Sequence, residues 1–272
     1  MIQRRSNLPK ADDPKEYNLE ESTLVGPPLP GEVIVSKTVD QLIDILAAEL
    51  VATAVICVRK FGDFHLALSG GNTPQPLYER LMYDPNCRNL PWANTHLWLV
   101  DERCVPLDDD RSNFRMINET IGTHSGIPAE QVHPIAAMSE TADTDYESQL
   151  RQALQHREAG EDRLDFVLLG MGHDGHTASL FPQQEVLHER VHIVRRVEAE
   201  QADPPWRVTM TFPLINAARM VSVLVTGSAK APMIQRLASG HETVDELPIK
   251  GVLPVQGELK WFLDAEACGH GD

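Results

Sequence analysis

Short apolar runs alternate along most of this chain with longer segments whose apolar residues recur at helical spacing, and this alternation limits the possible folds more than any other feature. The strand-like runs fall at residues 33–35, 64–68, 96–100, 164–169, 208–211, 220–226 and 260–263. Strands separated by helices pair mostly in parallel, with the helices covering both faces of the sheet. The sequence therefore predicts an α/β fold, with one three-layer α/β/α domain and a mostly parallel, Rossmann-like sheet over residues 31–272.

Three segments between these runs carry helix signals. Thr38 with Gln41 three residues later is a capping box, and the apolar residues from 39 to 50 follow it at helical spacing. Glycines at the ends of segments 141–160 and 227–240 are typical helix stops. We expect these two helices to end at Gly160 and Gly240.

The ends of the chain and its cysteines indicate where the protein works. Residues 1–30 are rich in proline and charge and predict a polar N-terminal extension without the apolar stretch of an export signal. No apolar run approaches the roughly 18 residues that span a bilayer. The four cysteines, Cys57, Cys87, Cys104 and Cys268, are scattered, which argues against a zinc site and a disulfide framework. We expect a cytoplasmic protein.

The net charge of the chain is −16, which repels nucleic acid and anionic membrane surfaces. We therefore expect neither as a partner. An anionic small molecule would bind only where a local group of cations overcomes this field.

Polar and glycine residues gather where the predicted strands end, and ligands of doubly wound sheets usually bind at the carboxyl ends of the strands. The first cluster is Ser69, Gly70, Gly71, Asn72 and Thr73. Glycines allow close backbone approach, and free N–H groups before a helix attract an anion such as phosphate. A tight turn with a threonine cap is the alternative interpretation.

The second cluster follows the run at 96–100. Asp101, Glu102 and Arg103 stand together there, and Ser112 with Asn113 begins the next helix. A surface ion pair is the alternative to a functional role, and the sequence does not decide which of the two carboxylates points inward.

The third cluster lies in the glycine-rich stretch after residue 169. Asp174 and His176 are two residues apart, close enough for the carboxylate to orient the imidazole and support its positive charge. The pair predicts a general base. A metal site using His173 and His176 with His188 and His192 is disfavoured, because no helical His-Glu-x-x-His pattern is present.

The fourth cluster joins Arg207, which opens one strand, with Lys230 in the first turn of a helix. A lysine is unfavourable at that end of the helix dipole unless an anion lies nearby. The two cations and the Ser-Gly-Gly loop together predict a phosphate pocket, although each cation alone is typical of a surface.

In these motifs the chain resembles the 6-phosphogluconolactonase family, within the larger group of sugar-phosphate isomerase-like and glucosamine-6-phosphate deaminase-like folds. The resemblance runs from about residue 33 to 267. It is carried by "SGGNTP", "DERCVPLDDDRSNFR", "GMGHDGHTASLFP", "RVTMTFPLINAAR" with "VTGSAKA", and "LPVQGELKWFLD". His173 stands where the family commonly has proline.

The resemblance implies hydrolysis of 6-phospho-D-glucono-1,5-lactone to 6-phospho-D-gluconate in the oxidative pentose phosphate pathway, with no cofactor. His176 would activate water, Asp174 would orient it, and Arg103 would stabilise the developing negative charge. The phosphate would lie against Ser69, Gly70, Gly71, Asn72 and Thr73, with Arg207 and Lys230 as its cations. The expected partner is the phosphosugar lactone alone, bound by a monomer or weak homo-oligomer.

Two other functions remain open. Deaminases of glucosamine 6-phosphate resemble "DGHIAFNEP", with a glutamate five residues after the histidine, where this chain has Phe181. Bacterial sugar sensors borrow this kind of fold without its chemistry, but they normally carry a DNA-binding helix-turn-helix. The short, acidic N-terminal segment does not fit such a unit.

Overall fold

The computed structural model describes residues 24–270 and builds them around a seven-stranded parallel sheet. The strand order is β1-β10-β9-β6-β2-β3-β5. The expected α/β fold with a mostly parallel sheet is confirmed. The strands of this sheet are β1 (Glu32–Ser36), β2 (Phe64–Leu68), β3 (Thr95–Leu99), β5 (Val132–His133), β6 (Phe166–Leu169), β9 (Met220–Val225) and β10 (Glu258–Asp264).

A second, three-stranded antiparallel sheet has the order β4-β8-β7. Its strands are β4 (Asp101–Arg103), β7 (Val194–Glu198) and β8 (Trp206–Met210). The expected strand at 208–211 therefore exists but lies outside the parallel sheet. A short apolar run has the same appearance in either sheet, because the pairing partners are distant in sequence.

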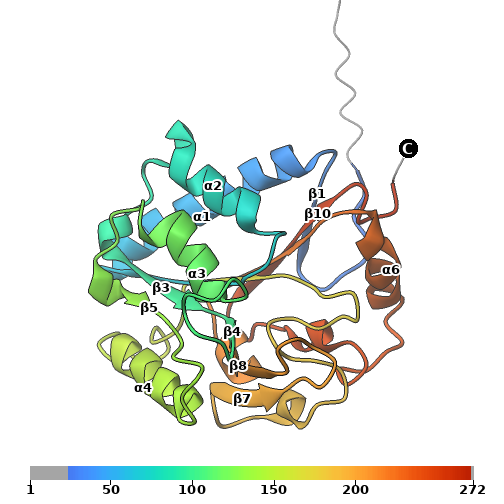
Figure 1. The fold of residues 1–272 in the computed structure, drawn as a ribbon. Helices are drawn as coiled ribbons and strands as arrows, with labels where there is room; N and C mark the ends of the chain where they lie inside the picture. The colour runs from blue at the N-terminus through green and yellow to red at the C-terminus, as the bar shows by residue number, and fades with distance from the viewer. Residues whose placement is uncertain (1–23, 271–272) are drawn as a thin grey trace, which may run out of the picture.

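Six α-helices are present among the described residues. They are α1 (Val39–Phe61), α2 (Gln75–Tyr83), α3 (Asn113–Ile117), α4 (Ala142–Leu154), α5 (Phe212–Ile215) and α6 (Ala231–Ser239). In the view of Figure 1, α1 and α2 lie together above the central strands, while α4 and the small sheet lie below. Short 3₁₀ and π turns lie at Pro85–Cys87, Trp92–Asn94, Asn118–Gly122, Ala129–Gln131, Glu185–His188, Ser228–Lys230 and Pro248–Gly251.

The helix ends follow the sequence signals in two cases of three. The Thr38 hydroxyl accepts a hydrogen bond from the Gln41 N–H at 3.2 Å, and Gly240 ends α6 in the left-handed region. The expected end of α4 at Gly160 is wrong, because the helix stops at Leu154. Arg157 lies beyond that point and turns its side chain into a buried ion pair with Asp165.

Helix α1 is long and apolar enough to cross a membrane by length and composition, so the expectation that no segment reaches this threshold is wrong for it. One side of the helix is buried in the core through Leu42, Leu46, Leu50 and Ala54. A core helix that covers a sheet meets the same two criteria.

The amino ends of β2 and β6 are joined by a buried charge network. Arg157 donates to the Asp165 carboxylate at 2.8 and 2.9 Å and contacts Asp63 as well. Asp165 is fully buried, and its second oxygen also accepts from the His65 N–H. The network fixes the edge of the sheet opposite the carboxyl ends.

The predicted extension at residues 1–30 lies partly outside the described residues. Within the described part, Leu29 is nearly buried, and the Pro30 carbonyl accepts a hydrogen bond from the Trp261 ring N–H at 2.8 Å. These contacts attach residues 29 and 30 to the rest of the domain.

Candidate active site

A cleft of about 210 Å³ lies at the carboxyl ends of β2 and β6, beside the small sheet. It is lined by residues 69–74, Asp101, Arg103, Asn113, 170–172, 176–178 and Arg207. Eight of the ten predicted site residues therefore meet in one cleft. Asp174 lies directly behind His176, whereas Lys230 is not part of the lining.

The His176 imidazole is held by Asp174. The Nδ1 atom lies 2.5 Å from the Asp174 carboxylate, which also accepts the His176 backbone N–H. Burial alone would raise the pKa of Asp174, but its hydrogen bond and charge interaction with His176 outweigh burial and hold the pKa at about 2. Since the ionised carboxylate places the proton on Nδ1, Nε2 is the nitrogen that can accept one.

Two glycines beside the His176–Asp174 dyad are sterically required. A Cβ on Gly172 would lie 2.1 Å from His176 Nδ1, and a Cβ on Gly175 would lie 2.5 Å from a Leu247 methyl group. Gly175 also has a φ of +82°. On its other side the His176 ring packs against Phe181 with the ring centres 4.3 Å apart. Packing and one hydrogen bond thus orient the imidazole before any ligand arrives.

Two guanidinium groups lie side by side in the cleft wall. Arg103 on β4 is the direct antiparallel partner of Arg207 on β8, so the two side chains leave the same face of the small sheet. Burial lowers the pKa of Arg207, and the positive charge of Arg103 lowers it further against the carboxylates nearby. Like charges directly opposite each other are unfavourable, and an anion between them would remove the repulsion.

The structure decides between the two carboxylates of the second cluster. Asp101 lines the cleft and accepts a 2.6 Å hydrogen bond from the Ser179 hydroxyl. Glu102 is fully buried and faces the other way, where it accepts the N–H groups of Asn113 and Phe114. Burial raises the pKa of Glu102, and these hydrogen bonds oppose the rise. Glu102 therefore holds the first turn of α3 against the cleft wall.

The glycine loop after β2 has the features of an anion site. Gly71 has a φ of +91°, and a Cβ on Gly70 would lie 1.8 Å from Asn113 Oδ1. Within the described part of the chain, the N–H groups of Gly71, Asn72 and Thr73 donate to no protein acceptor. Thr73 is not the cap of α2, because Pro74 occupies that place without a side-chain bond.

Two of the residues that were predicted to bind phosphate form hydrogen bonds within the protein. The Ser69 hydroxyl donates to the Leu168 carbonyl at 2.8 Å and so joins the ends of β2 and β6. Lys230 Nζ donates to the Met171 carbonyl at 2.7 Å, and burial lowers the pKa of this lysine. The lysine supports the loop that forms one wall of the cleft.

Among the lining residues that the sequence did not assign to the site are two with buried polar side chains, Asn113 and Thr177. Asn113 is 2% exposed and donates to the Asp101 carbonyl, whereas the sequence placed it only at the start of the helix after the second cluster. Thr177 donates to the Gly170 carbonyl at 2.9 Å and follows His176 directly, which is the signal that could have found it. The next residue, Ala178, has a φ of +51°, a strained conformation of the kind that occurs at functional sites.

The four histidines of the metal alternative do not come together among the described residues. His173 is exposed on the loop, while His188 and His192 pair with Asp245 and Glu147. A different group, Asp63 with His65 and His96, is close enough to hold an ion. However, the Trp98 ring N–H donates to His65 Nδ1 at 3.1 Å, so His65 Nε2 carries the proton and donates to Asp63.

The cleft thus places a carboxylate-supported imidazole opposite two arginines and a row of free backbone N–H groups. Such a site can take a proton from water, stabilise negative charge on an oxygen and bind a second anionic group a few ångströms away. These are the requirements for hydrolysis of a phosphorylated acyl compound.

The chain belongs to the family described as glucosamine-6-phosphate isomerases/6-phosphogluconolactonase, which matches residues 37–261. Family membership confirms the resemblance in the strand-end motifs.

Three relatives illustrate this membership. The human GDH/6PGL endoplasmic bifunctional protein is 41% identical over 238 residues, which is 86% of this chain and 30% of that protein. This chain therefore spans under a third of the length of that relative. The 6-phosphogluconolactonase of Nostoc sp. is 37% identical over 77% of this chain and 85% of its own length. The crystal structure of 6-phosphogluconolactonase from Thermotoga maritima has 29% identity and a TM-score of 0.73, covering 86% of this chain and 99% of that one.

Proposed function

We propose that this protein hydrolyses 6-phospho-D-glucono-1,5-lactone to 6-phospho-D-gluconate, as the names of its Nostoc and Thermotoga relatives indicate for them. The observation that carries the proposal is the His176–Asp174 dyad facing Arg103 and Arg207 across one small cleft. A lactone that carries a phosphate needs a base at one end and cations for two separate negative charges.

His176 Nε2 takes a proton from water, and the water oxygen attacks the lactone carbonyl carbon. Arg103 stabilises the resulting oxyanion, and Asp174 stabilises the imidazolium. When the intermediate collapses, the bond from that carbon to the ring oxygen breaks and His176 returns the proton to the leaving oxygen. The products are a hydroxyl group and a carboxylic acid, which ionises in water. Arg207 and the N–H groups of residues 71–73 hold the phosphate.

The test measures lactone disappearance above the spontaneous rate for the wild type and for His176→Ala. General base assistance contributes roughly 10²- to 10⁴-fold, so kcat should fall by that factor. Asp174→Asn tests the orientation of the imidazole and should also lower kcat. A His176→Ala enzyme with wild-type turnover would remove this histidine from the mechanism.

Glucosamine 6-phosphate serves as the parallel substrate, because the family name includes its isomerases. Phe181 packs against His176 at the position where the deaminase motif has glutamate, so no carboxylate is available there for ring opening. We expect no ammonia release. Ammonia production without acceleration of lactone hydrolysis would assign the protein to the deaminase branch.

The phosphate assignment rests on Arg207, which is 8% exposed and donates to the Pro204 carbonyl through Nε. Arg207→Gln should raise KM with little change in kcat, because the phosphate lies away from the reacting carbon. Lys230→Gln is the comparison: its amine donates to the Met171 carbonyl, so we expect a smaller rise in KM.

We also propose a cytoplasmic protein that is a monomer or weak homo-oligomer. All four cysteines are free, and two of them, Cys57 and Cys87, are buried. This usage suits a reducing compartment. Fractionation of cells and sedimentation velocity of the purified protein test the two statements.

A further inference from the structure

A second and larger cavity, of about 1120 Å³, lies at the edge of the sheet opposite the active site. We call it the basal groove. Its walls are the end of α4 and residues 160–163, the segment 187–193, α5 with residues 216 and 217, and residues 251–256. Residues 160–163 precede β6, whereas the active-site residues 170–172 follow it. A molecule in the basal groove therefore leaves the catalytic cleft open.

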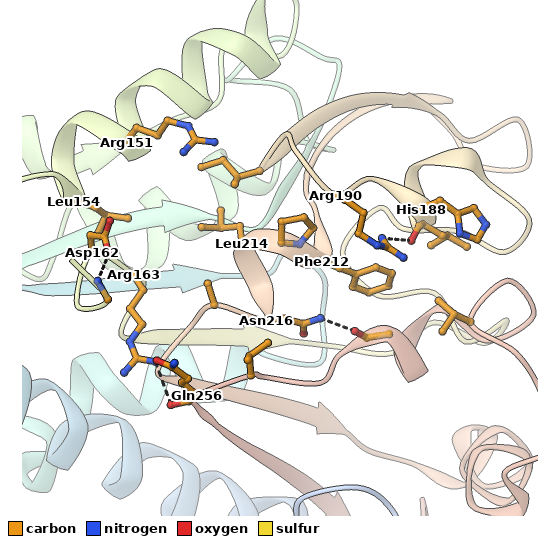
Figure 2. Close-up of a pocket in the computed structure, with 18 of the residues that line it drawn as sticks. Arg151, Leu154, Asp162, Arg163, His188, Arg190, Phe212, Leu214, Asn216 and Gln256 are labelled. Atoms are coloured by element: carbon orange, nitrogen blue, oxygen red, sulfur yellow. Dashed lines mark hydrogen bonds between the residues drawn. The ribbon is translucent and has the colours of Figure 1, made fainter.

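The basal groove has an apolar floor that continues onto the exposed surface. Figure 2 shows Phe212 and Leu214 in its centre, and Leu154 and Ile193 also line it. Val255 lines the groove and is 82% exposed. Two further apolar residues extend this exposed surface beside the groove. They are Leu253, 52% exposed and bonded through its N–H to the lining residue Asn216, and Val191, 73% exposed and next to the lining residue Arg190. Apolar surface with a charged border is typical of an interaction site.

The charges at the border are positive, in contrast to the chain as a whole. The lining holds Arg151, Arg163 and Arg190 against a single carboxylate, Asp162, in a chain of net charge −16. Figure 2 shows Arg151 and Arg163 on one side of the apolar floor and Arg190 on the other.

Two of these arginines have little carboxylate neutralisation within residues 24–270. Arg190 donates only to backbone carbonyls, those of Leu187 and Glu189. Arg163 lies 3.9 Å from Glu161, which is already bonded to two other cations, and its Nη1 donates to the Gln256 carbonyl at 3.1 Å. Arg151 is paired with Glu147 on its own helix. The guanidinium groups of Arg163 and Arg190 are therefore available to pair with carboxylates of another molecule.

We propose that the basal groove docks an acidic, amphipathic segment of another protein. Apolar side chains of the segment lie on Phe212 and Leu214, and carboxylates at its two ends meet Arg163 and Arg190. The apolar surface continues outside the cavity onto Val191, Leu253 and Val255, which suits a peptide better than a metabolite enclosed by its site. Helix-in-groove docking uses this combination of an apolar face and complementary charge.

The test measures the binding of a fluorescein-labelled peptide of about 16 residues, with leucine on one helical face and glutamate elsewhere. Two comparison peptides replace every glutamate with lysine or every leucine with glutamine. We expect the acidic amphipathic peptide to bind more tightly than the two comparison peptides. Its affinity for the double variant Arg163→Gln/Arg190→Gln should be lower on the order of tenfold, since each charged contact at such a border contributes modestly. Val255→Ser should weaken it further.

The matched control is Lys37→Gln/Arg88→Gln, which removes two exposed cations outside the lining of the basal groove and should leave binding unchanged. Lactone hydrolysis should be unchanged in all these variants, so failure of this proposal is distinguishable from failure of the proposed activity. Equal affinity for the lysine or glutamine peptide, equal weakening in the control, or no binding at roughly millimolar peptide would overturn the proposal. Self-association of the wild type that the double variant abolishes would also overturn it, because the occupant would then be a second copy.

Discussion

Gly172→Ala tests whether catalysis depends on the position of the His176 ring rather than on its presence alone. An ideal Cβ at residue 172 lies 2.1 Å from His176 Nδ1 and 2.7 Å from Asp174 Oδ1, whereas ordinary contact begins at 3.4 Å. The imidazole and the backbone of residue 172 must therefore move apart by about 1.3 Å, the difference between the first and last of these distances. A misplacement of about 1 Å costs roughly 10²-fold in rate. We expect kcat to fall by about that factor and KM to change little.

The assay is the initial rate of lactone loss above the spontaneous background, with the thermal midpoint of unfolding measured in parallel to show that the variant is folded. The φ of Gly172 is not in the left-handed region, so alanine introduces no backbone strain. Gly170→Ala is the control, because a Cβ there meets no atom within 4 Å. In this control the NMR signal of the His176 Nδ1 proton should be as in the wild type.

A folded Gly172→Ala enzyme with kcat within about threefold of the wild type would refute the reasoning. In that case the dyad either tolerates displacement or is not the base. A loss of rate with an unchanged Nδ1 proton signal would also contradict it, because the structure assigns the loss to broken contact with Asp174.

Three further predictions concern stability. Burial lowers the pKa of His96 to about 4 and of His133 to about 3, so the unfolded chain binds more protons below pH 6.5. The free energy of unfolding should therefore be highest above pH 6.5 and fall towards pH 4. The loss at pH 5 should be on the order of 1–2 kcal/mol once solvent access to the two histidines is allowed for. In urea titrations, the free energy of unfolding of His96→Gln/His133→Gln should depend less on pH than that of the wild type. Arg157→Met leaves the carboxylate of Asp165, which is fully buried, without its bidentate partner and should cost about 3 kcal/mol in urea unfolding; a change within experimental error would contradict this. Thr38→Ala removes the cap of α1 and should cost about 1 kcal/mol, whereas equal stability would show that the cap is dispensable.

Local signals predicted the elements whose contacts lie near in sequence. The start of α1 depends on a hydrogen bond between residues three apart, and the dyad joins residues two apart, so both could be inferred from spacing. The end of α4 could not, because Arg157 pairs with Asp63 and Asp165, and Asp63 is 94 residues away in the chain. A glycine at 160 was the stronger local signal, but the tertiary ion pair decided the path of the chain.

The active site, too, was predictable only where its contacts are local in sequence. The strand-end motifs around residues 69–73 and 170–176 predicted which loops would meet, since carboxyl ends of parallel strands share one edge. The antiparallel register of β4 with β8 places Arg103 opposite Arg207, more than a hundred positions later in the sequence. No local pattern contains that register.

By itself, then, the sequence determined the parallel α/β architecture, the family and the general base candidate, because hydrophobic periodicity, glycine turns and short-range hydrogen bonds are properties of neighbouring residues. Tertiary structure alone decided that Asp101 faces the cleft while Glu102 holds α3, and that Lys230, which is not part of the lining, donates to the Met171 carbonyl. It also assembled the basal groove from four distant segments. These features depend on which segments of the chain pack together, and packing is decided by the free energy of the whole core rather than by any one stretch of residues.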